Sequence, residues 1–282
     1  MVQATLHDGS PLELEVHGSG PTVLLPVNPH PATGSRADEM RKWGMDPELG
    51  RSLVRGLGDD FRVVAFDYEG HVLAHPKPDT LTPDNIAADL VAVADAAGAD
   101  RFAYYGYSWL ALSGLQLAVR TNRLSALAMG GFPALGGPYA EMLRVTIATH
   151  EMSGSASSEP QQAPQSGDEY DWSTVEVTMT KSQTRQFVTL YEALQEFDDR
   201  AAQPLISCPR LCFVGSADTI PYGERWGGVT VDIAGAVAGH RAELEAAGWD
   251  VRVLDGLDHT TAMQPGAVLP VLRLWLTAQL GR

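Results

Sequence analysis

Short apolar segments alternate with amphipathic segments along most of this chain. The apolar segments include VVAF, FAYYGY, LSALAMGG and RLCFVG. Residues 82–98 show the amphipathic type, because Thr82 can cap a helix, Pro83 suits the first helical position and Gly98 follows the last apolar residue. Strands that are apolar throughout are buried on both faces, which requires helices on both sides of a mostly parallel sheet. The alternation therefore predicts an α/β fold with such a central sheet.

The strand and helix alternation stops after about residue 133 and resumes at about residue 205. The intervening segment contains two helical stretches, which predicts a helical cap at 133–204 inserted into a core formed by 1–132 and 205–282. Residues 153–172 within this cap are rich in Ser, Gln, Pro and acidic residues. Such a composition buries little apolar surface, so we expect a mobile loop there.

Charge and hydrophobicity exclude two classes of partner. The formal net charge is −15 and the chain has no cluster of Lys and Arg that could neutralise phosphates, so we expect no binding to nucleic acid. Apolar runs fall short of the roughly 18 residues needed to span a bilayer, and the N-terminus lacks the pattern of a signal peptide. We expect a soluble, cytoplasmic protein with no membrane partner. Its oligomeric state stays open, with a homodimer as one option.

Both cysteines, Cys208 and Cys212, lie in the segment SCPRLCFVG, which is typical of a strand. Four residues of strand separate two positions by about 13 Å, which is beyond the reach of a disulfide. We therefore expect two buried free thiols.

Ser108 lies where a predicted strand passes directly into a predicted helix. Gly106, two residues earlier, relieves crowding at the sharp turn that this junction requires. The amides at the start of the helix can stabilise a negative charge, as the oxyanion of acyl transfer requires. Gly50-Arg51-Ser52 also fits the pattern Gly-x-Ser, but no strand precedes it. Ser108 is therefore the candidate nucleophile.

A serine nucleophile needs a histidine base and a carboxylate that orients the histidine. Among the eight histidines, His259 follows the last predicted strand by a short loop, which brings it to the sheet edge of Ser108. Asp218 follows the strand RLCFVG at the same edge, and we prefer it to Asp258, which directly precedes the histidine. His71 and His75 are four residues apart in a loop-like segment with two prolines, so we expect no metal site there.

The order Ser108, Asp218, His259, together with the turn around the serine, resembles the α/β-hydrolase superfamily. GSGPTVLLPVNPH is similar to the oxyanion loop of that superfamily and VVAFDYEGHVLAHP to its fourth strand and the following turn. FVGSADTI and GLDHTTA are similar to its acid and histidine loops. The resemblance covers about 1–132 and 205–282 and leaves the cap unmatched. It implies an α/β-hydrolase fold and no cofactor, and the break in the alternation adds the inserted helical cap.

Two positions depart from the pattern of the superfamily. Leu110 stands where a small residue is usual, so we expect the turn to open slightly. Pro26-Val27-Asn28-Pro29 replaces the usual His-Gly, and since proline has no N–H, an oxyanion hole here would use the amides of Asn28 and Trp109. We expect the substrate pocket to be lined by His30, Tyr107, Phe132 and Met263, and His150 is a further candidate for a substrate contact.

The leading hypothesis is a serine hydrolase that acts on a small-molecule ester, lactone or thioester through an acyl-enzyme. Relatives that attack with an aspartate are excluded by the serine at 108. Three alternatives stay open: a carbon–carbon hydrolase, an acyltransferase, and a scaffold that binds or isomerises a small molecule without hydrolysing it.

Overall fold

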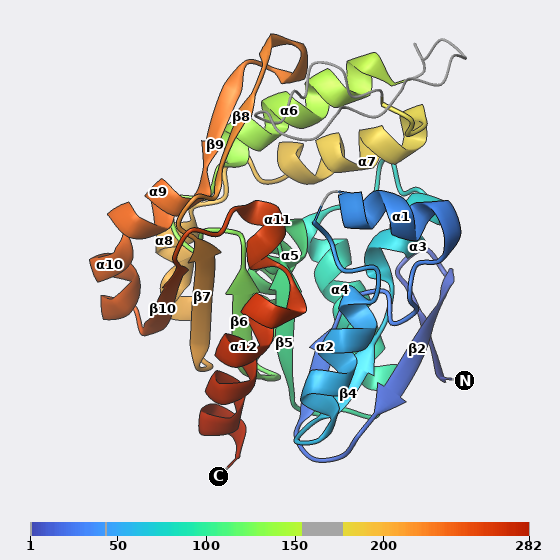
Figure 1. Cartoon of the computed structure of the whole chain (residues 1–282), viewed down its shortest axis with the longest axis vertical. Coiled ribbons are helices and arrows are strands. Elements are labelled where there is room, and N and C mark those ends of the chain that lie inside the picture. The colour runs from blue at the N-terminus through green and yellow to red at the C-terminus, as the bar shows by residue number, and fades with distance from the viewer. Residues whose placement is uncertain (1, 43, 154–176, 282) are drawn as a thin grey trace.

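The computed structural model describes residues 2–42, 44–153 and 177–281. The predicted mobile loop, 153–172, lies outside these ranges except for Ser153. An eight-stranded sheet stands at the centre of the described part (Figure 1), in the order β1-β2-β4-β3-β5-β6-β7-β10. Its strands are β1 Val2–Thr5, β2 Pro11–His17, β3 Thr22–Leu25, β4 Arg62–Ala65, β5 Phe102–Tyr107, β6 Leu124–Gly130, β7 Arg210–Gly215 and β10 Trp249–Leu254.

The pairing of the strands confirms the predicted, mostly parallel sheet. β2 pairs antiparallel with β1 and with β4. The other neighbouring pairs in this sheet are parallel. The carboxyl ends of the parallel strands therefore lie along one edge, where the loops that carry functional side chains meet.

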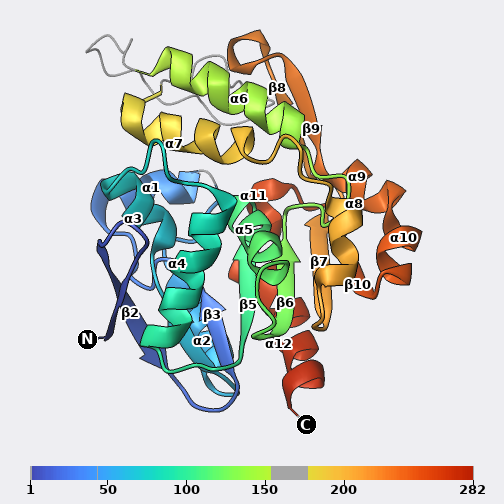
Figure 2. The same cartoon turned by 180° about the vertical axis from the view of Figure 1, so that it is seen from behind.

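Helices cover both faces of the sheet, as predicted. α2 and α12 lie over one face (Figure 1), and α4 and α5 lie over the other (Figure 2). Within β3, Val23 and Leu25 pack toward α2 and α12, whereas Leu24 packs into the core on the opposite side. The helices are α1 Gly34–Lys42, α2 Leu49–Gly58, α3 Tyr68–Ala74, α4 Pro83–Ala96, α5 Trp109–Ala118, α6 Tyr139–Met152, α7 Lys181–Glu192, α8 Asp199–Ala202, α9 Ile233–Gly239, α10 Arg241–Ala246, α11 His259–Ala262 and α12 Pro265–Leu280.

Two further sequence predictions concern helix α4 and the cysteines. The Thr82 hydroxyl accepts a hydrogen bond from the Asn85 amide, and Pro83 occupies the first turn, so α4 begins as expected. Cys212 lies in β7, whereas Cys208 precedes that strand, and both are buried free thiols. None of the helices in the described part could cross a membrane.

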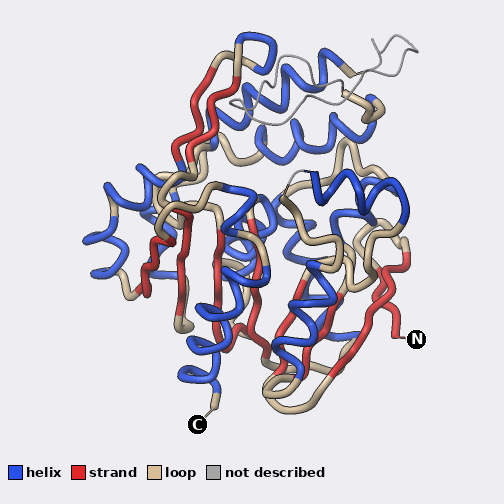
Figure 3. Tube along the Cα trace, viewed as in Figure 1, coloured by secondary structure: helices blue, strands red, loops and turns tan. Residues whose placement is uncertain are grey.

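Helices α6 and α7 lie side by side beyond the edge of the sheet, within the segment expected to form the cap (Figure 1). A two-stranded hairpin that the sequence analysis missed extends alongside α6 (Figure 3). It consists of β8 Thr219–Tyr222 and β9 Val229–Asp232. Arg144 in α6 donates a hydrogen bond of 2.7 Å from Nη2 to the carbonyl oxygen of Gly227 in the turn of the hairpin. The hairpin begins directly after Asp218 and therefore joins α6 to the edge of the sheet.

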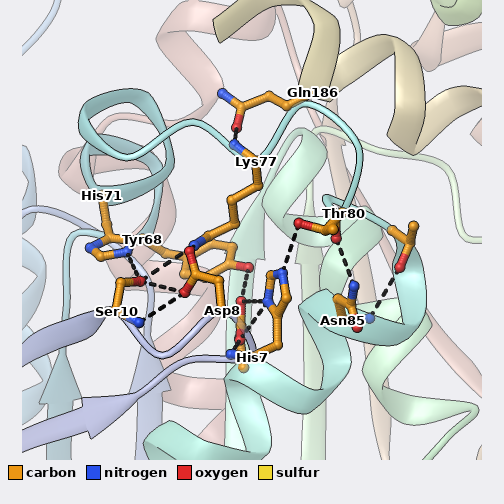
Figure 4. Close-up of polar contacts among 11 residues, drawn as sticks. His7, Asp8, Ser10, Tyr68, His71, Lys77, Thr80, Asn85 and Gln186 are labelled. Atoms are coloured by element: carbon orange, nitrogen blue, oxygen red, sulfur yellow. Dashed lines mark hydrogen bonds and ion pairs between the residues drawn. The ribbon is translucent and has the colours of Figure 1, made fainter. Parts of the chain in front are cut away.

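A network of partly buried polar side chains anchors the turn between β1 and β2 to α3 and to the loop that follows it (Figure 4). The Lys77 side chain is 1% exposed, and its ammonium contacts the carboxylate of Asp8. Ser10 donates a hydrogen bond of 2.5 Å from Oγ to Asp8 Oδ1 and lies 2.9 Å from His71 Nε2. The backbone amide of Lys77 donates to Gln186 Oε1 in α7 at 3.0 Å. One lysine thus joins the N-terminal hairpin to helix α7.

Replacing Lys77 by methionine tests this network. The variant leaves the Asp8 carboxylate in a partly buried site without its cation, so we expect the free energy of unfolding to fall by about 2 kcal/mol, less than for a fully buried pair. Urea denaturation measures the change. Lys42→Met at an exposed position of α1 is the control and should lie close to the wild type. Equal stability of the Lys77 variant and the control would contradict the assignment.

Stability should also depend on pH through His71. Burial lowers the pKa of the His71 imidazole, and Lys77 and His75 act in the same direction, whereas Asp8 and Asp89 oppose them. An unfolded chain binds this proton near pH 6.5. Below about that pH the unfolded state holds more protons than the native state, so the free energy of unfolding falls as the pH drops.

His71→Gln keeps a donor toward Ser10 but does not titrate. In urea titrations between about pH 7.5 and pH 5, we expect the variant to lose stability less steeply than the wild type. Equal slopes would show that His71 is not the group responsible.

Candidate active site

Ser108 lies on a strained turn between β5 and α5. Its φ is +57° and its ψ is −129°, and it is the sole non-glycine residue of the described part with a positive φ. The turn brings the start of α5 against the end of β5, since a Cβ on Gly106 would lie 2.3 Å from the carbonyl oxygen of Leu110. Glycine is therefore required at position 106. A side chain presented on such a turn is exposed to an incoming substrate.

Leu110 does not open this turn, contrary to our expectation. Its side chain is buried, and its carbonyl oxygen accepts a hydrogen bond of 2.8 Å from the hydroxyl of Tyr104 in β5. The amide of Ser108 donates to the carbonyl oxygen of Gly130 at the end of β6. Strand and helix therefore stay close together, because the larger side chain points into the core rather than between the two backbones.

The side chains of Ser108, His259 and Asp218 form a continuous chain of hydrogen bonds. His259 Nε2 lies 3.1 Å from Ser108 Oγ. On the other side of the ring, His259 Nδ1 lies 3.1 Å from Oδ1 and 3.0 Å from Oδ2 of Asp218. The Asp218 carboxylate is fully buried and can only accept hydrogen bonds when ionised, so Nδ1 carries the proton and Nε2 of the neutral ring can accept one from Ser108.

Separate elements hold the histidine and the aspartate in place. Asp218 follows β7, and its carbonyl oxygen accepts a hydrogen bond of 2.9 Å from the amide of Ala234 beyond the β8–β9 hairpin. His259 is the first residue of α11, which the Asp258 carboxylate caps by accepting from the Thr261 amide at 2.7 Å. Asp258 is therefore occupied in capping, whereas Asp218 faces the imidazole. This arrangement agrees with the preference for Asp218.

Tyr107 fixes the backbone of the histidine loop. Its hydroxyl donates a hydrogen bond of 2.8 Å to the carbonyl oxygen of His259. Burial raises the pKa of this hydroxyl, with Asp218 adding to the effect, so Tyr107 stays protonated and remains a donor. A residue expected to line the pocket therefore also ties the end of β5 to α11.

The two candidate oxyanion donors both border one cavity with Ser108. The amides of Trp109 and Asn28 donate no hydrogen bond to the rest of the described chain. Asn28 lies in a tight loop, because its Oδ1 accepts from the His30 amide at 2.9 Å and a Cβ on Gly50 would lie 1.9 Å from its carbonyl oxygen. Both amides are thus available to a ligand, and Pro29 does not remove the donor at position 28.

The cavity beside Ser108 has a volume of about 800 Å³. The residues that line it in the described part of the chain fall within 26–53, 67–73, 105–110 and 259–263. No described residue of the segment 133–204 is among them, whereas Arg36 and Met40 of α1 are. Helix α7 contacts lining residues from outside the cavity: the ring of Phe187 packs edge-on against that of Trp109 with 5.5 Å between centroids, and Gln183 Nε2 donates a hydrogen bond of 2.7 Å to the carbonyl oxygen of Leu73.

Some of the residues expected to line the pocket or contact the substrate do line the cavity, and others do not. Asn28, His30, Tyr107 and Met263 line the cavity together with Ser108, Trp109 and His259. Phe132 does not line it and is buried against Tyr139, because the chain turns into the core after β6. His150 lies away from it in α6, where its Nδ1 is 2.8 Å from Thr184 Oγ1.

Three charged residues of the cavity wall were missed by the sequence analysis. Arg36, Asp67 and Glu69 all line the cavity. Glu69 follows the strand VVAF by a few residues, so its place at a strand end was a usable signal. Arg36 had none, because the segment around it gave no clear strand or helix pattern.

Comparisons with known proteins identify the fold. No protein-family model matches the chain, and neither does any curated protein. A thermophilic esterase from Thermogutta terrifontis is similar in structure, with a TM-score of 0.57 and 18% identity over 99% of this chain and 98% of that one. An α/β hydrolase from Sphaerobacter thermophilus has a TM-score of 0.54 and 22% identity over 98% of this chain and 100% of that one.

The bottromycin epimerase BotH is also similar, with a TM-score of 0.54 and 16% identity over 98% of each chain. These likenesses extend over nearly the full length of this chain. The chain therefore has the α/β-hydrolase fold.

Proposed function

We propose that this protein is a serine hydrolase that cleaves a small ester, lactone or thioester through an acyl-enzyme. The observation that carries the proposal is the hydrogen-bonded set of Ser108, His259 and Asp218, which opens onto a cavity. Nucleophile, base and orienting acid stand in the relation that acyl transfer by serine requires. The similarity to an esterase and to other hydrolases agrees with this assignment.

The chemistry follows from the proton positions in this set. Ser108 Oγ attacks the carbonyl carbon of the substrate while His259 Nε2 takes the hydroxyl proton, and the buried Asp218 carboxylate stabilises the imidazolium. The Trp109 and Asn28 amides donate to the oxyanion of the tetrahedral intermediate. His259 then passes its proton to the departing alcohol, thiol or, for a lactone, ring oxygen. Water, activated by the same histidine, hydrolyses the acyl-enzyme and restores Ser108.

The dimensions of the cavity favour a small organic substrate. A volume of about 800 Å³ is within the range of pockets that hold small molecules. Much of the wall is apolar, including Met40, Met45, Leu53, Leu73 and Met263. Methionine and leucine side chains suit an apolar acyl or alcohol group, and methionine adapts its shape to the group that binds.

The fold alone does not decide between hydrolysis and other reactions, since one similar structure is that of an epimerase. Carbon–carbon hydrolysis and acyl transfer would use the same nucleophile. The alternative of a scaffold without hydrolase activity gives no reason for a strained serine within 3.1 Å of a histidine that a buried carboxylate orients. The geometry therefore favours covalent catalysis by Ser108.

Labelling with a fluorophosphonate probe tests the nucleophile. The wild type should react stoichiometrically at Ser108 and hydrolyse p-nitrophenyl acetate, and Ser108→Ala should lose both activities while keeping its melting temperature. Ser52→Ala is the matched control, because Ser52 also follows the pattern Gly-x-Ser but lies in α2. The control should label like the wild type. A folded wild type that never labels would overturn the proposal.

Asp218→Asn tests the orienting acid. The amide can donate to Nδ1 and so favours the wrong tautomer of His259, and we expect kcat to fall by about 10³–10⁴. Steady-state hydrolysis of p-nitrophenyl acetate gives the value, and Asp255→Asn, at an exposed position of the same loop as His259, should change little. An Asp218 variant with wild-type kcat would exclude this residue from the reaction.

A further inference from the structure

The indole of Trp109 is held by a carboxylate that belongs to another part of the fold. Trp109 Nε1 donates a hydrogen bond of 2.9 Å to Oε1 of Glu69. Trp109 is the first residue of α5 and directly follows Ser108, whereas Glu69 lies in α3, after β4. Both residues line the cavity. The contact therefore joins two loops of the sheet edge across the wall beside the candidate nucleophile.

Aromatic neighbours restrict the indole on two other sides. Phe187 in α7 packs edge-on against it at 5.5 Å, and the ring of Tyr68 lies tilted at 6.1 Å, both measured between centroids. The cavity occupies another side. If the hydrogen bond to Glu69 is lost, the indole N–H must find another acceptor or water, and the cavity is open space into which the indole can rotate.

The neighbouring carboxylate of Asp67 cannot take the place of Glu69 as the acceptor for the Trp109 indole. Asp67 also lines the cavity, but its Oδ1 accepts from the Gly70 amide at 2.9 Å and so caps α3. Partial removal from water raises the pKa of Glu69, the hydrogen bond from Trp109 lowers it, Asp67 raises it and Arg36 lowers it, with a net increase. The residue as a whole stays exposed, and the Trp109 indole is the partner that its carboxylate contacts.

We propose that Glu69 is a positioning residue that determines substrate specificity by holding the Trp109 indole in the wall of the cavity beside Ser108. The inference rests on the proposed hydrolase function. With the indole held, the cavity keeps its full length for the acyl or alcohol chain of the substrate. Once released, the indole occupies part of that space, and a long chain loses more binding than a short one.

The test compares Glu69→Leu, which removes the acceptor, with Glu69→Gln, which keeps a carbonyl acceptor for the indole. Two ester series are used. The first compares p-nitrophenyl acetate with p-nitrophenyl hexanoate and varies the acyl chain, and the second compares methyl acetate with hexyl acetate and varies the alcohol chain. We expect the ratio of kcat/KM for long over short substrate to fall about tenfold in one series for Glu69→Leu, as for other changes of pocket shape. Glu69→Gln should keep the wild-type ratio, and so should Glu39→Leu at an exposed position of α1.

A ratio of two substrates does not move when a variant is merely less stable, because both rates fall together. Combining Glu69→Leu with Trp109→Phe adds a second check, since phenylalanine has no N–H to hold. In that background the Glu69 substitution should leave the ratio unchanged. Independent, additive effects of the two substitutions would overturn the proposal.

A spectroscopic measurement keeps this inference separate from the proposed function. The ¹⁵N–¹H resonance of the Trp109 indole, assigned by its loss in Trp109→Phe, should shift as Glu69 titrates and should stop doing so in Glu69→Gln. A wild type that hydrolyses no ester overturns the hydrolase function. An active wild type whose chain-length ratios are the same in Glu69→Leu, or an indole resonance that ignores Glu69, overturns the role of Glu69 alone.

Discussion

The left-handed backbone at Ser108 is the constraint on which the rest of the site depends. A non-glycine residue in such a conformation costs about 1–3 kcal/mol and persists only where the surroundings enforce it. Here the amide of Ser108 is bound to β6, and the Tyr104 hydroxyl binds the first turn of α5. The close contact of strand and helix at Gly106 leaves the serine side chain directed away from both. A parallel sheet covered by helices is the scaffold that supplies these restraints.

The same sheet explains how residues distant in sequence reach one another. β5, β7 and β10 are parallel members of one sheet, so the loops that follow them emerge at one edge. Ser108, Asp218 and His259 each lie in one of those loops. The strand pairing therefore brings His259 to the same edge as Ser108 and Asp218, each of which lies within 3.1 Å of the imidazole. This is why loop position was a better guide to the histidine than residue type.

Sequence patterns predicted what depends on periodicity and on strand ends. The buried strands and α4 with its Thr82 cap follow from local patterns. The preference for Asp218 rather than Asp258 as the partner of His259 also rests on such a pattern. The β8–β9 hairpin was missed, since TIPYGERWGGVTVD has no sustained alternation of apolar residues and packs against α6 only in three dimensions. The sequence analysis also missed that residues of α1 line the cavity, for a similar reason. Phe132 was placed in the pocket because a strand end alone does not show which way the chain turns next.

Helix α3 shows how the core network and the candidate site depend on each other. A helix of seven residues is too short to be stable by itself, so contacts made by its side chains must hold it. Tyr68 donates from its hydroxyl to the fully buried Asp89 in α4 at 2.8 Å, and His71 contacts Ser10 in the N-terminal turn. Glu69 lies between them in sequence and faces the cavity instead. Because the polar network at the N-terminal hairpin helps to hold the helix from which Glu69 extends, it also supports the position of the acceptor that binds the Trp109 indole.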